Sequence, residues 1–280
     1  MASPMNIELY NQSCLNMGKV KDQSVDLTLT SPPYWNSIDY DTHTKNQKAW
    51  HRSRDYDVFG KTFDDYLKNL KKAFAETRRK TKEGGFCAIV AGTILHKTKH
   101  YPMPMLLTNA MLETGWEFHQ DIVWHKCTGG IKRAGSFIQK PKSGYFYPNI
   151  MTEYILIFCK PGKVHRGKAQ SLKIDDLFTK EIANNVWHIA PVPPNQIAHP
   201  CAFPEELARR IILLYSDKGD TILDPFIGSG QTAIAAKREN RSCIGYDIEP
   251  KYIELALDRL LKMPDKRPTN LIARFESLKI

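Results

Sequence analysis

The sequence predicts an α/β fold in which a mostly parallel, twisted sheet carries helices on both faces. Apolar runs of strand length alternate with amphipathic segments of helical period along most of the chain, and this alternation is typical of parallel sheets. The 280 residues suffice for one large α/β domain or two small ones. No internal repeat or low-complexity tract indicates another architecture.

The segment before residue 126 begins the alternation. VDLTLT (25–30) is expected to form a strand, and 63–80 a helix whose apolar residues share one face. GGFCAIVAG (84–92) has the composition of a buried strand, 102–115 that of a helix ended by Gly115, and EFHQDIVWH (117–125) that of another strand. TEYILIFCK (152–160) is expected to add a further strand. The apolar face of the first helix consists of Phe63, Tyr66, Leu67, Leu70 and Phe74.

The same rhythm returns after about residue 185. FPEELARRIILLYS (203–216) predicts an amphipathic helix with Pro204 near its start and two glutamates in the first turn, where the helix dipole favours acids. DTILDPFIGSGQTAIAAKREN (220–240) predicts a strand, a glycine-rich turn and a helix. SCIGYDIEPKYIELALDRLLKM (242–263) predicts a strand that ends in an acid and a helix that Pro250 opens.

The composition indicates a soluble protein of a reducing compartment. Hydrophobic residues make up 42% and charged residues 25% of the chain, and no apolar run reaches the roughly 20 residues of a membrane span. The first twelve residues lack the features of a secretion signal. The six cysteines (Cys14, Cys87, Cys127, Cys159, Cys201 and Cys243) form no C-x-x-C pair, which favours free thiols and a cytoplasmic location. His96 and His100 are four residues apart, but Tyr101-Pro102 breaks any helix there, so no metal site is expected.

The net charge of +10 is concentrated in one part of the chain. Between Lys126 and Lys173 ten Lys or Arg residues face a single acid, Glu153, and aromatic residues lie among them in GSFIQKPKSGYFYPN (135–149). A charge run can simply be a solvated face, but this density with interleaved glycines and aromatics favours a surface for a polyanion. The long polar loop 41–62 lies beside the first motif in sequence and is of a length that is usually functional or disordered. The cations expected to contact the polyanion are Lys126, Lys132, Arg133, Lys140, Lys142, Arg52 and Arg54.

The turn in ILDPFIGSGQT (222–232) indicates a ligand-binding strand end. Gly228 and Gly230 allow close approach of backbone to a ligand, and the helix N-terminus that follows suits a carboxylate or phosphate. The next strand ends at Asp247, about twenty residues later, where a nucleoside-binding α/β unit places an acid for the ribose hydroxyls. Glu249 is interpreted instead as an acid at the N-terminus of the following helix.

The stretch TSPPYW (30–35) has the chemistry of a pocket for a planar ring that bears an NH2 group. Ser31 offers a hydroxyl acceptor, Pro32 and Pro33 present carbonyls from a stiff backbone, and Tyr34 offers a flat face. The lone pair of such an amine is delocalised into the ring, which makes the nitrogen a poor nucleophile. Two acceptors that hold both hydrogens out of plane would push the nitrogen towards sp3 and release that lone pair.

These residues carry a resemblance to a known family. DLTLTSPPYW (26–35) resembles motif IV of the DNA amino-methyltransferases, and LDPFIGSGQT (223–232) resembles their motif I, which binds S-adenosylmethionine. Motif IV precedes motif I, as in the β class, and AHPCAFPEELARRII (198–212) falls where motif X is expected. The Ser-Pro-Pro-Tyr form is similar to the cytosine-N4 enzymes of restriction-modification systems. Gln231, between Gly230 and Thr232, is a departure that some members share.

The resemblance implies a Rossmann-like S-adenosylmethionine-dependent methyltransferase fold with a small basic target-recognition insertion. Residues 1–125 would be the catalytic half with the target-base pocket, 126–185 the basic DNA-binding region, and 186–280 the cofactor-binding half. The partner would be double-stranded DNA, with a cognate restriction endonuclease acting separately and no membrane. The amine would be bound and activated by Ser31, Pro32, Pro33 and Tyr34. The cofactor would be held by Asp224, Pro225, Phe226, Gly228, Gly230, Thr232 and Asp247, and on the motif X side by His199, Pro200 and Phe203.

Several alternatives stay open at the level of sequence. Methylation of adenine N6 uses the same fold, cofactor and amine chemistry. Methylation of cytosine C5 would need a thiolate, for which Pro200-Cys201 is the only candidate pattern, and a partner glutamate; the single Glu-Asn pair, Glu239-Asn240, continues with Arg241 at an expected helix end. A non-catalytic nucleic-acid-binding module with a degenerate cofactor pocket is the alternative outside enzymes, and an RNA substrate is not excluded.

Overall fold

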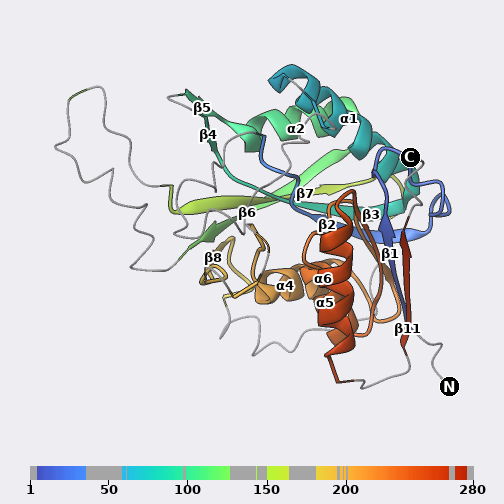
Figure 1. The fold of residues 1–280 in the computed structure, drawn as a ribbon. Helices are drawn as coiled ribbons and strands as arrows, with labels where there is room; N and C mark the ends of the chain where they lie inside the picture. Colours follow the sequence, from blue (N-terminus) through green and yellow to red (C-terminus); the bar gives the residue numbers. More distant parts are fainter. Residues whose placement is uncertain are drawn as a thin grey trace.

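The computed structural model describes residues 5–35, 59–60, 62–96, 99–126, 143, 150–163, 181–193, 196–197, 199, 201–264 and 269–275. Within these residues, a nine-stranded sheet runs through the middle of the molecule (Figure 1). Its spatial order is β11-β1-β10-β9-β2-β3-β7-β6-β8. The strands are β1 (Met5–Asn11), β2 (Val25–Thr30), β3 (Thr81–Ala91), β6 (Glu117–His125), β7 (Thr152–Cys159), β8 (Val186–His188), β9 (Thr221–Asp224), β10 (Ser242–Asp247) and β11 (Thr269–Phe275).

The sheet is mostly parallel, as the sequence predicts. β7 pairs antiparallel with both β3 and β6, and each of the other described pairings is parallel. β7 therefore runs against the other eight strands. It lies inside the basic range 126–185, so the sheet takes residues 152–159 from the middle of that range.

Helices cover both faces of the sheet, as the sequence predicts. α1 (Phe63–Lys80) and α2 (Met103–Glu113) lie on one face, and α4 (Glu205–Tyr215), α5 (Gln231–Arg238) and α6 (Pro250–Leu261) lie on the other (Figure 1). Each face has its own core of fully buried side chains. One core contains Leu70 and Phe74 of α1, and the other contains Ile211 of α4 and Ile234 of α5.

The start of α1 is fixed by a capping box. Thr62 accepts a hydrogen bond from the Asp65 backbone at 3.1 Å, and the Asp65 carboxylate accepts one from the Thr62 backbone at 3.3 Å. The two exchanged bonds satisfy N–H groups that have no partner within the helix. This cap sets where the first turn of α1, including Tyr66, meets the residues that follow β2.

Five strands are additions to what the sequence predicts. β1 and β11 extend one end of the sheet, β8 closes the other, and β4 (Ile94–His96) pairs with β5 (Lys99–Tyr101) in a small hairpin. β1 matters for function, because it lies next to β10 and ends at the same edge as the two motif strands. No helix within the described part of the chain is long and apolar enough to cross a membrane.

Candidate active site

The candidate active site is a cavity at the carboxyl edge of four neighbouring strands. β1, β10, β9 and β2 are adjacent and parallel, so the residues that follow them meet at one edge of the sheet, the place where open α/β sheets bind ligands. The cavity has a volume of about 180 Å³. Its walls consist of Gln12, Ser13, Cys14, Ser31, Pro33, Tyr34, Phe59, His199, Cys201, Pro225, Phe226, Asp247, Ile248, Glu249, Lys251 and Tyr252.

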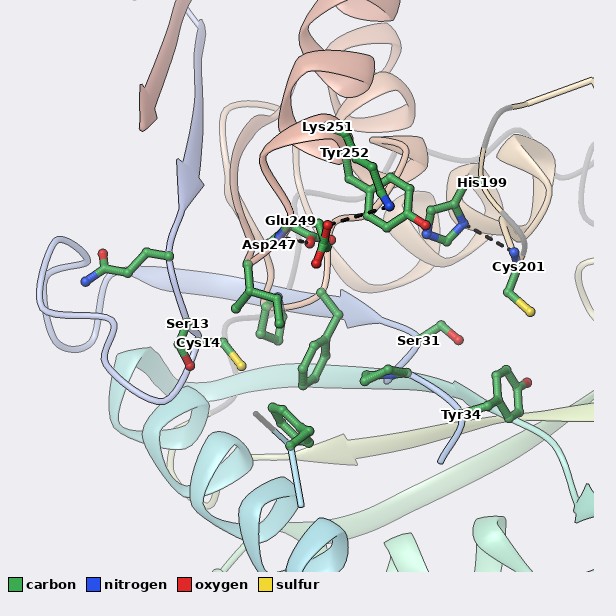
Figure 2. A pocket seen from close by; sticks show the side chains of 16 residues that line it. Ser13, Cys14, Ser31, Tyr34, His199, Cys201, Asp247, Glu249, Lys251 and Tyr252 are labelled. Atoms are coloured by element: carbon green, nitrogen blue, oxygen red, sulfur yellow. Dashed lines mark hydrogen bonds and ion pairs between the residues drawn. The ribbon is translucent and has the colours of Figure 1, made fainter. Parts of the chain in front are cut away.

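The cavity has two chemically different ends. Figure 2 shows Ser13 and Cys14 on one side of the view and Ser31 and Tyr34 on the other, with Asp247 and Glu249 between them. In the sequence, Ser13 and Glu249 are more than two hundred residues apart. The parallel order of the strands is what brings them together.

Asp224 organises the turn after β9 from behind the cavity wall. It is 1% exposed and accepts hydrogen bonds from Thr30 Oγ1 and Thr232 Oγ1, both at 2.6 Å, and from the Phe226 backbone at 3.0 Å. Burial raises its pKa to about 6, although these bonds lower it. Asp224 is not part of the cavity wall. Its bonds to Thr30 and Thr232 instead join the ends of the two motif strands.

Gly228 and His199 form one wall together. Gly228 has φ +47, and a Cβ placed there would lie 2.7 Å from His199 Nε2, so only glycine leaves room for the imidazole. The ring of His199 also packs against Tyr252, with centroids 4.6 Å apart. Its Nδ1 accepts a bond from the Cys201 backbone at 3.3 Å, which in the neutral ring leaves the proton on Nε2.

Asp247 holds the same turn from the β10 side. Its carboxylate accepts from the Gly228 backbone at 3.1 Å and from the Glu249 backbone at 2.8 Å. Burial raises its pKa to about 7, against the lowering effect of these two bonds, and the charges of Glu249 and Asp224 raise it further. Each oxygen keeps one lone-pair site after these bonds. Asp247 can therefore still accept hydroxyl donors from a ligand.

Glu249 is a wall residue as well as the residue that precedes α6. It occupies the N-cap of α6 without a side-chain cap bond, and its carboxylate lies 3.6 Å from Lys251 Nζ. Both residues line the cavity. The interpretation of Glu249 as a helix-terminal acid is correct in position, but the side chain also faces the cavity.

The Ser-Pro-Pro-Tyr segment follows β2 directly and supplies the opposite end. Ser31, Pro33 and Tyr34 line the cavity. The Pro33 carbonyl accepts a hydrogen bond from Tyr66 Oη at 2.8 Å, and Tyr66 is only 3% exposed. One of the two carbonyls expected to face the amine is thus already engaged by α1. The other belongs to Pro32, a buried residue between the wall residues Ser31 and Pro33, and it remains the candidate backbone acceptor.

The aromatic side chains connect the two motif segments. Phe226 packs edge-to-face against Phe59 with centroids 5.3 Å apart, and Phe59 packs in the same way against Tyr66 at 6.2 Å. Phe59 and Tyr66 are both buried. The turn that follows β9 and the segment that follows β2 therefore rest on one shared aromatic cluster.

The predicted site residues divide into those that line the cavity and those that support it. Seven of them line it: Ser31, Pro33, Tyr34, His199, Pro225, Phe226 and Asp247. The supporting residues are buried and do not line the cavity; they are Pro32, Asp224, Gly228, Gly230, Thr232 and Phe203. Pro200 lies outside the described residues. The wall residues that sequence reasoning missed are Gln12, Ser13, Cys14, Phe59, Ile248, Lys251 and Tyr252.

Most of the predicted DNA-binding cations lie outside the described residues, namely Lys132, Arg133, Lys140, Lys142, Arg52 and Arg54. Lys126 is described. Its Nζ pairs with Glu153 and lies 5.1 Å from the centroid of the Trp124 ring. The single acid of the basic window is thus paired with its first cation. Among the described residues no group of three or more His, Cys, Asp or Glu side chains could hold a metal ion.

The fold and this site define a Rossmann-like methyltransferase. The family model for DNA methylases of the N6 and N4 type matches residues 25–258, and the chain belongs to this family. This confirms the resemblance to the DNA amino-methyltransferases. The family covers both adenine-N6 and cytosine-N4 enzymes, so membership alone leaves the methylated base open.

The chain is similar to several named proteins over most of its length. It is 28% identical to the type II methyltransferase M.MthZI of Methanothermobacter thermautotrophicus, over 90% of this chain and 76% of that one. It is 30% identical to M.HpaI of Haemophilus parainfluenzae, over 86% and 69%. A putative DNA modification methylase of Thermus thermophilus, TTHA0409, has a TM-score of 0.71 at 25% identity, over 96% and 100%. The cytosine-N4-specific PvuII DNA methyltransferase has a TM-score of 0.68 at 18% identity, over 94% and 89%, which shows the shared fold.

Proposed function

We propose that this chain transfers a methyl group from S-adenosyl-L-methionine to the exocyclic N4 amine of cytosine in double-stranded DNA. One observation carries the proposal: Ser31 and Tyr34 line the same cavity as Asp247. A hydroxyl acceptor and a flat ring at one end, with carboxylates beyond them, suit an aromatic amine beside a nucleoside. The chemistry of this wall fits both substrates of a base methyltransferase.

The cavity wall fits S-adenosyl-L-methionine, the methyl donor. A structure of TTHA0409 complexed with this molecule exists. In this chain, Asp247 and Glu249 offer carboxylate oxygens to ribose hydroxyls. The face of the Phe226 ring would attract the positively charged sulfonium, an interaction worth about 0.5–2 kcal/mol. The bare Gly228 backbone leaves room for the His199 ring, which lines the cavity. When bound, the cofactor supplies an electrophilic methyl group.

Ser31 and the Pro32 carbonyl supply the two acceptors that an NH2 group requires. Held by both hydrogens, the amine nitrogen loses conjugation with the ring and becomes nucleophilic. Tyr34 offers a stacking face for the base. Since no covalent enzyme intermediate is needed, catalysis rests on positioning and on polarisation of the amine.

The amine of a paired base is held inside the duplex, so the target cytosine has to leave the duplex to reach the cavity. Flipping costs a few kcal/mol, and stacking against Tyr34 offsets part of that cost. The cations of 126–185 and of the loop 41–62 are the proposed source of duplex affinity, through contacts with phosphates. Of the proposed cations, Lys126 contributes less, because Glu153 already neutralises it.

We further propose a role as the modification enzyme of a restriction-modification system. The relatives M.MthZI and M.HpaI are named type II methyltransferases. M.BamHII of Bacillus amyloliquefaciens, 28% identical over 86% of this chain and 90% of that one, is named an orphan methyltransferase. A cognate endonuclease that acts separately is thus an expectation for the type II relatives and not a requirement of the fold.

Serine in place of aspartate at the start of the amine-binding motif favours cytosine N4 over adenine N6. Cytosine C5 methylation is disfavoured on geometry. Cys201 lines the cavity, but Glu239, the candidate partner acid, sits at the C-cap of α5 and accepts from Arg209 at 2.7 Å. An α-helix of eight residues spans about 12 Å, so Glu239 lies at the far end of α5 from the cavity.

The proposal is tested by methyl transfer from labelled S-adenosyl-L-methionine to duplex DNA. Ser31→Ala removes one acceptor and is expected to lower turnover by roughly 10²–10³-fold, the loss typical of one transition-state hydrogen bond. Affinity for the cofactor should hardly change. Ser24→Ala is the matched control, because Ser24 immediately precedes β2 whereas Ser31 immediately follows it. Equal turnover of Ser31→Ala and wild type would remove Ser31 from the mechanism.

A further inference from the structure

Gln231 occupies a position at which three segments of the cofactor-binding half meet. It is the first residue of α5, follows the left-handed Gly230 (φ +82), and is 5% exposed. A buried primary amide requires partners for both its oxygen and its nitrogen.

The Gln231 amide bridges the motif X segment and α6. Its Nε2 donates to the Phe203 carbonyl at 2.7 Å, and its Oε1 accepts from the Arg259 guanidinium at 2.6 Å. The same guanidinium also donates to the Ser229 carbonyl. Since a carbonyl only accepts and a guanidinium only donates, one orientation of the amide satisfies both partners.

The segment from His199 to Phe203 is consequently attached to the glycine turn at both of its ends. At one end the His199 ring fills the space above Gly228. At the other end the Phe203 carbonyl is tied to Gln231. Phe203 does not line the cavity, so its contribution is this backbone anchor.

α6 supports the turn from the other side at close range. A Cβ at Gly230 would lie 2.8 Å from Ala256 Cβ, so α6 packs directly against the turn. Arg259, one helical turn further along α6, reaches the Ser229 carbonyl from there. Burial lowers the pKa of Arg259, but a guanidinium stays charged in proteins. Its bonds to Ser229 and Gln231 are therefore charge-assisted and stronger than neutral ones.

We infer that Gln231, held by Arg259, is a positioning residue for the cofactor wall. It sets the distance between the motif X segment and the glycine turn, and thereby keeps His199 against the cavity. This inference rests on the proposed function, since it assigns the affected ligand as S-adenosyl-L-methionine. It gives a role to the residue at which the glycine motif departs from the family pattern.

Gln231→Glu is the sharpest test because it exchanges only the amide nitrogen for an oxygen. A glutamate still pairs with Arg259, but it presents an acceptor to the Phe203 carbonyl, so the anchor is lost. The dissociation constant for S-adenosyl-L-methionine, measured by calorimetry, is expected to rise about 10- to 100-fold. Turnover at saturating cofactor should stay within about twofold of wild type, since the loss is in ground-state binding. Arg259→Met should weaken binding in the same way.

Arg241→Met is the matched control for general destabilisation. Arg241 is also a buried arginine that donates to two carbonyls, those of Ser216 and Glu239. It immediately precedes β10, at the edge of the sheet opposite to the cavity. This variant should lower the free energy of unfolding without changing the cofactor dissociation constant of the folded protein.

Hydrogen exchange of the cofactor-free protein supplies a readout independent of binding. In Gln231→Glu the backbone amides of Cys201 and Phe203 should exchange faster, while those of β9 should not change. Unchanged affinity and unchanged exchange in Gln231→Glu would overturn the inference, and so would an equal loss of affinity in Arg241→Met. Failure of the wild type to bind S-adenosyl-L-methionine would instead remove the proposed function itself.

Discussion

Gly228→Ala is expected to weaken cofactor binding far more than it weakens the fold. The substitution adds one methyl group at a residue with φ +47, and that methyl group would lie 2.7 Å from His199 Nε2. Ordinary van der Waals contact begins at 3.4 Å. The imidazole would have to move away by about 0.7 Å, the difference between these two distances. Because His199 lines the cavity, this movement displaces part of the cavity wall.

Two costs of this substitution can be separated. The left-handed conformation costs an alanine about 1–2 kcal/mol relative to glycine, and this cost falls on the free energy of unfolding. The cost of displacing His199 instead reduces the affinity for the cofactor. Misplacement of a site by about 1 Å can cost about 10²-fold, so the dissociation constant for S-adenosyl-L-methionine should rise between about 10- and 100-fold, or about 1.4–2.8 kcal/mol.

The chain provides a matched control for the backbone cost. Gly219 also has a positive φ, +93, but a Cβ there would meet nothing within 4 Å. Calorimetric titration and urea unfolding of both variants therefore separate the two terms. Both should lose similar stability, and only Gly228→Ala should lose affinity. Equal affinity of Gly228→Ala and wild type would refute the assignment of this turn and His199 to the cofactor wall.

Three further predictions concern the remaining parts of the site. Burial raises the pKa of Asp247 to about 7, so its carboxyl binds a proton more tightly in the folded protein than in the unfolded chain. The free energy of unfolding should therefore fall as pH rises from about 4 to about 7. Thermal melting across this pH range should show a smaller fall for Asp247→Asn, and an identical pH dependence in the two proteins would contradict the raised pKa. Tyr66→Phe frees the Pro33 carbonyl and should lower turnover about 10-fold with little change in cofactor affinity. The control variant Tyr215→Phe should keep the turnover of the wild type. Equal turnover in the two variants would exclude a positioning role for Tyr66. If about six cations of the basic region meet phosphates, log K for duplex DNA should fall with log[salt] at a slope of about −5; neutralising Lys140 and Lys142 should reduce the slope by about one for each lost contact, and a near-zero slope in the wild type would make the region a solvated face.

The sequence carries most of the sheet and of the amine-binding motif because both are local patterns. EFHQDIVWH and VDLTLT form the expected strands, since apolar spacing and flanking residues define them without distant partners. Ser31 and Asp247 could be placed at strand ends for the same reason. The carboxyl ends of parallel strands meet at one edge, so their proximity also follows.

The missing parts depend on contacts that no local pattern encodes. β1 shows strand-like alternation, with Ile7 and Leu9 fully buried, but its place beside β10 is set by tertiary pairing. That pairing brings Gln12 and Ser13 to the cavity. Tyr66 has the spacing of a core residue, and only the docking of α1 shows that its hydroxyl reaches Pro33. The sequence around Asp224 would look the same whether its carboxylate bound a ligand or, as in the structure, Thr30 and Thr232.

The identity of the methylated base tests the central proposal most directly. Duplex DNA incubated with the protein and labelled S-adenosyl-L-methionine is digested to nucleosides, and the products are separated by mass spectrometry. The proposed geometry, with Ser31 and the Pro32 carbonyl as acceptors for an NH2 group, predicts N4-methylcytosine and neither N6-methyladenine nor 5-methylcytosine. N6-methyladenine would move the enzyme to the sister specificity, and 5-methylcytosine that disappears in Cys201→Ser would contradict direct transfer to an amine.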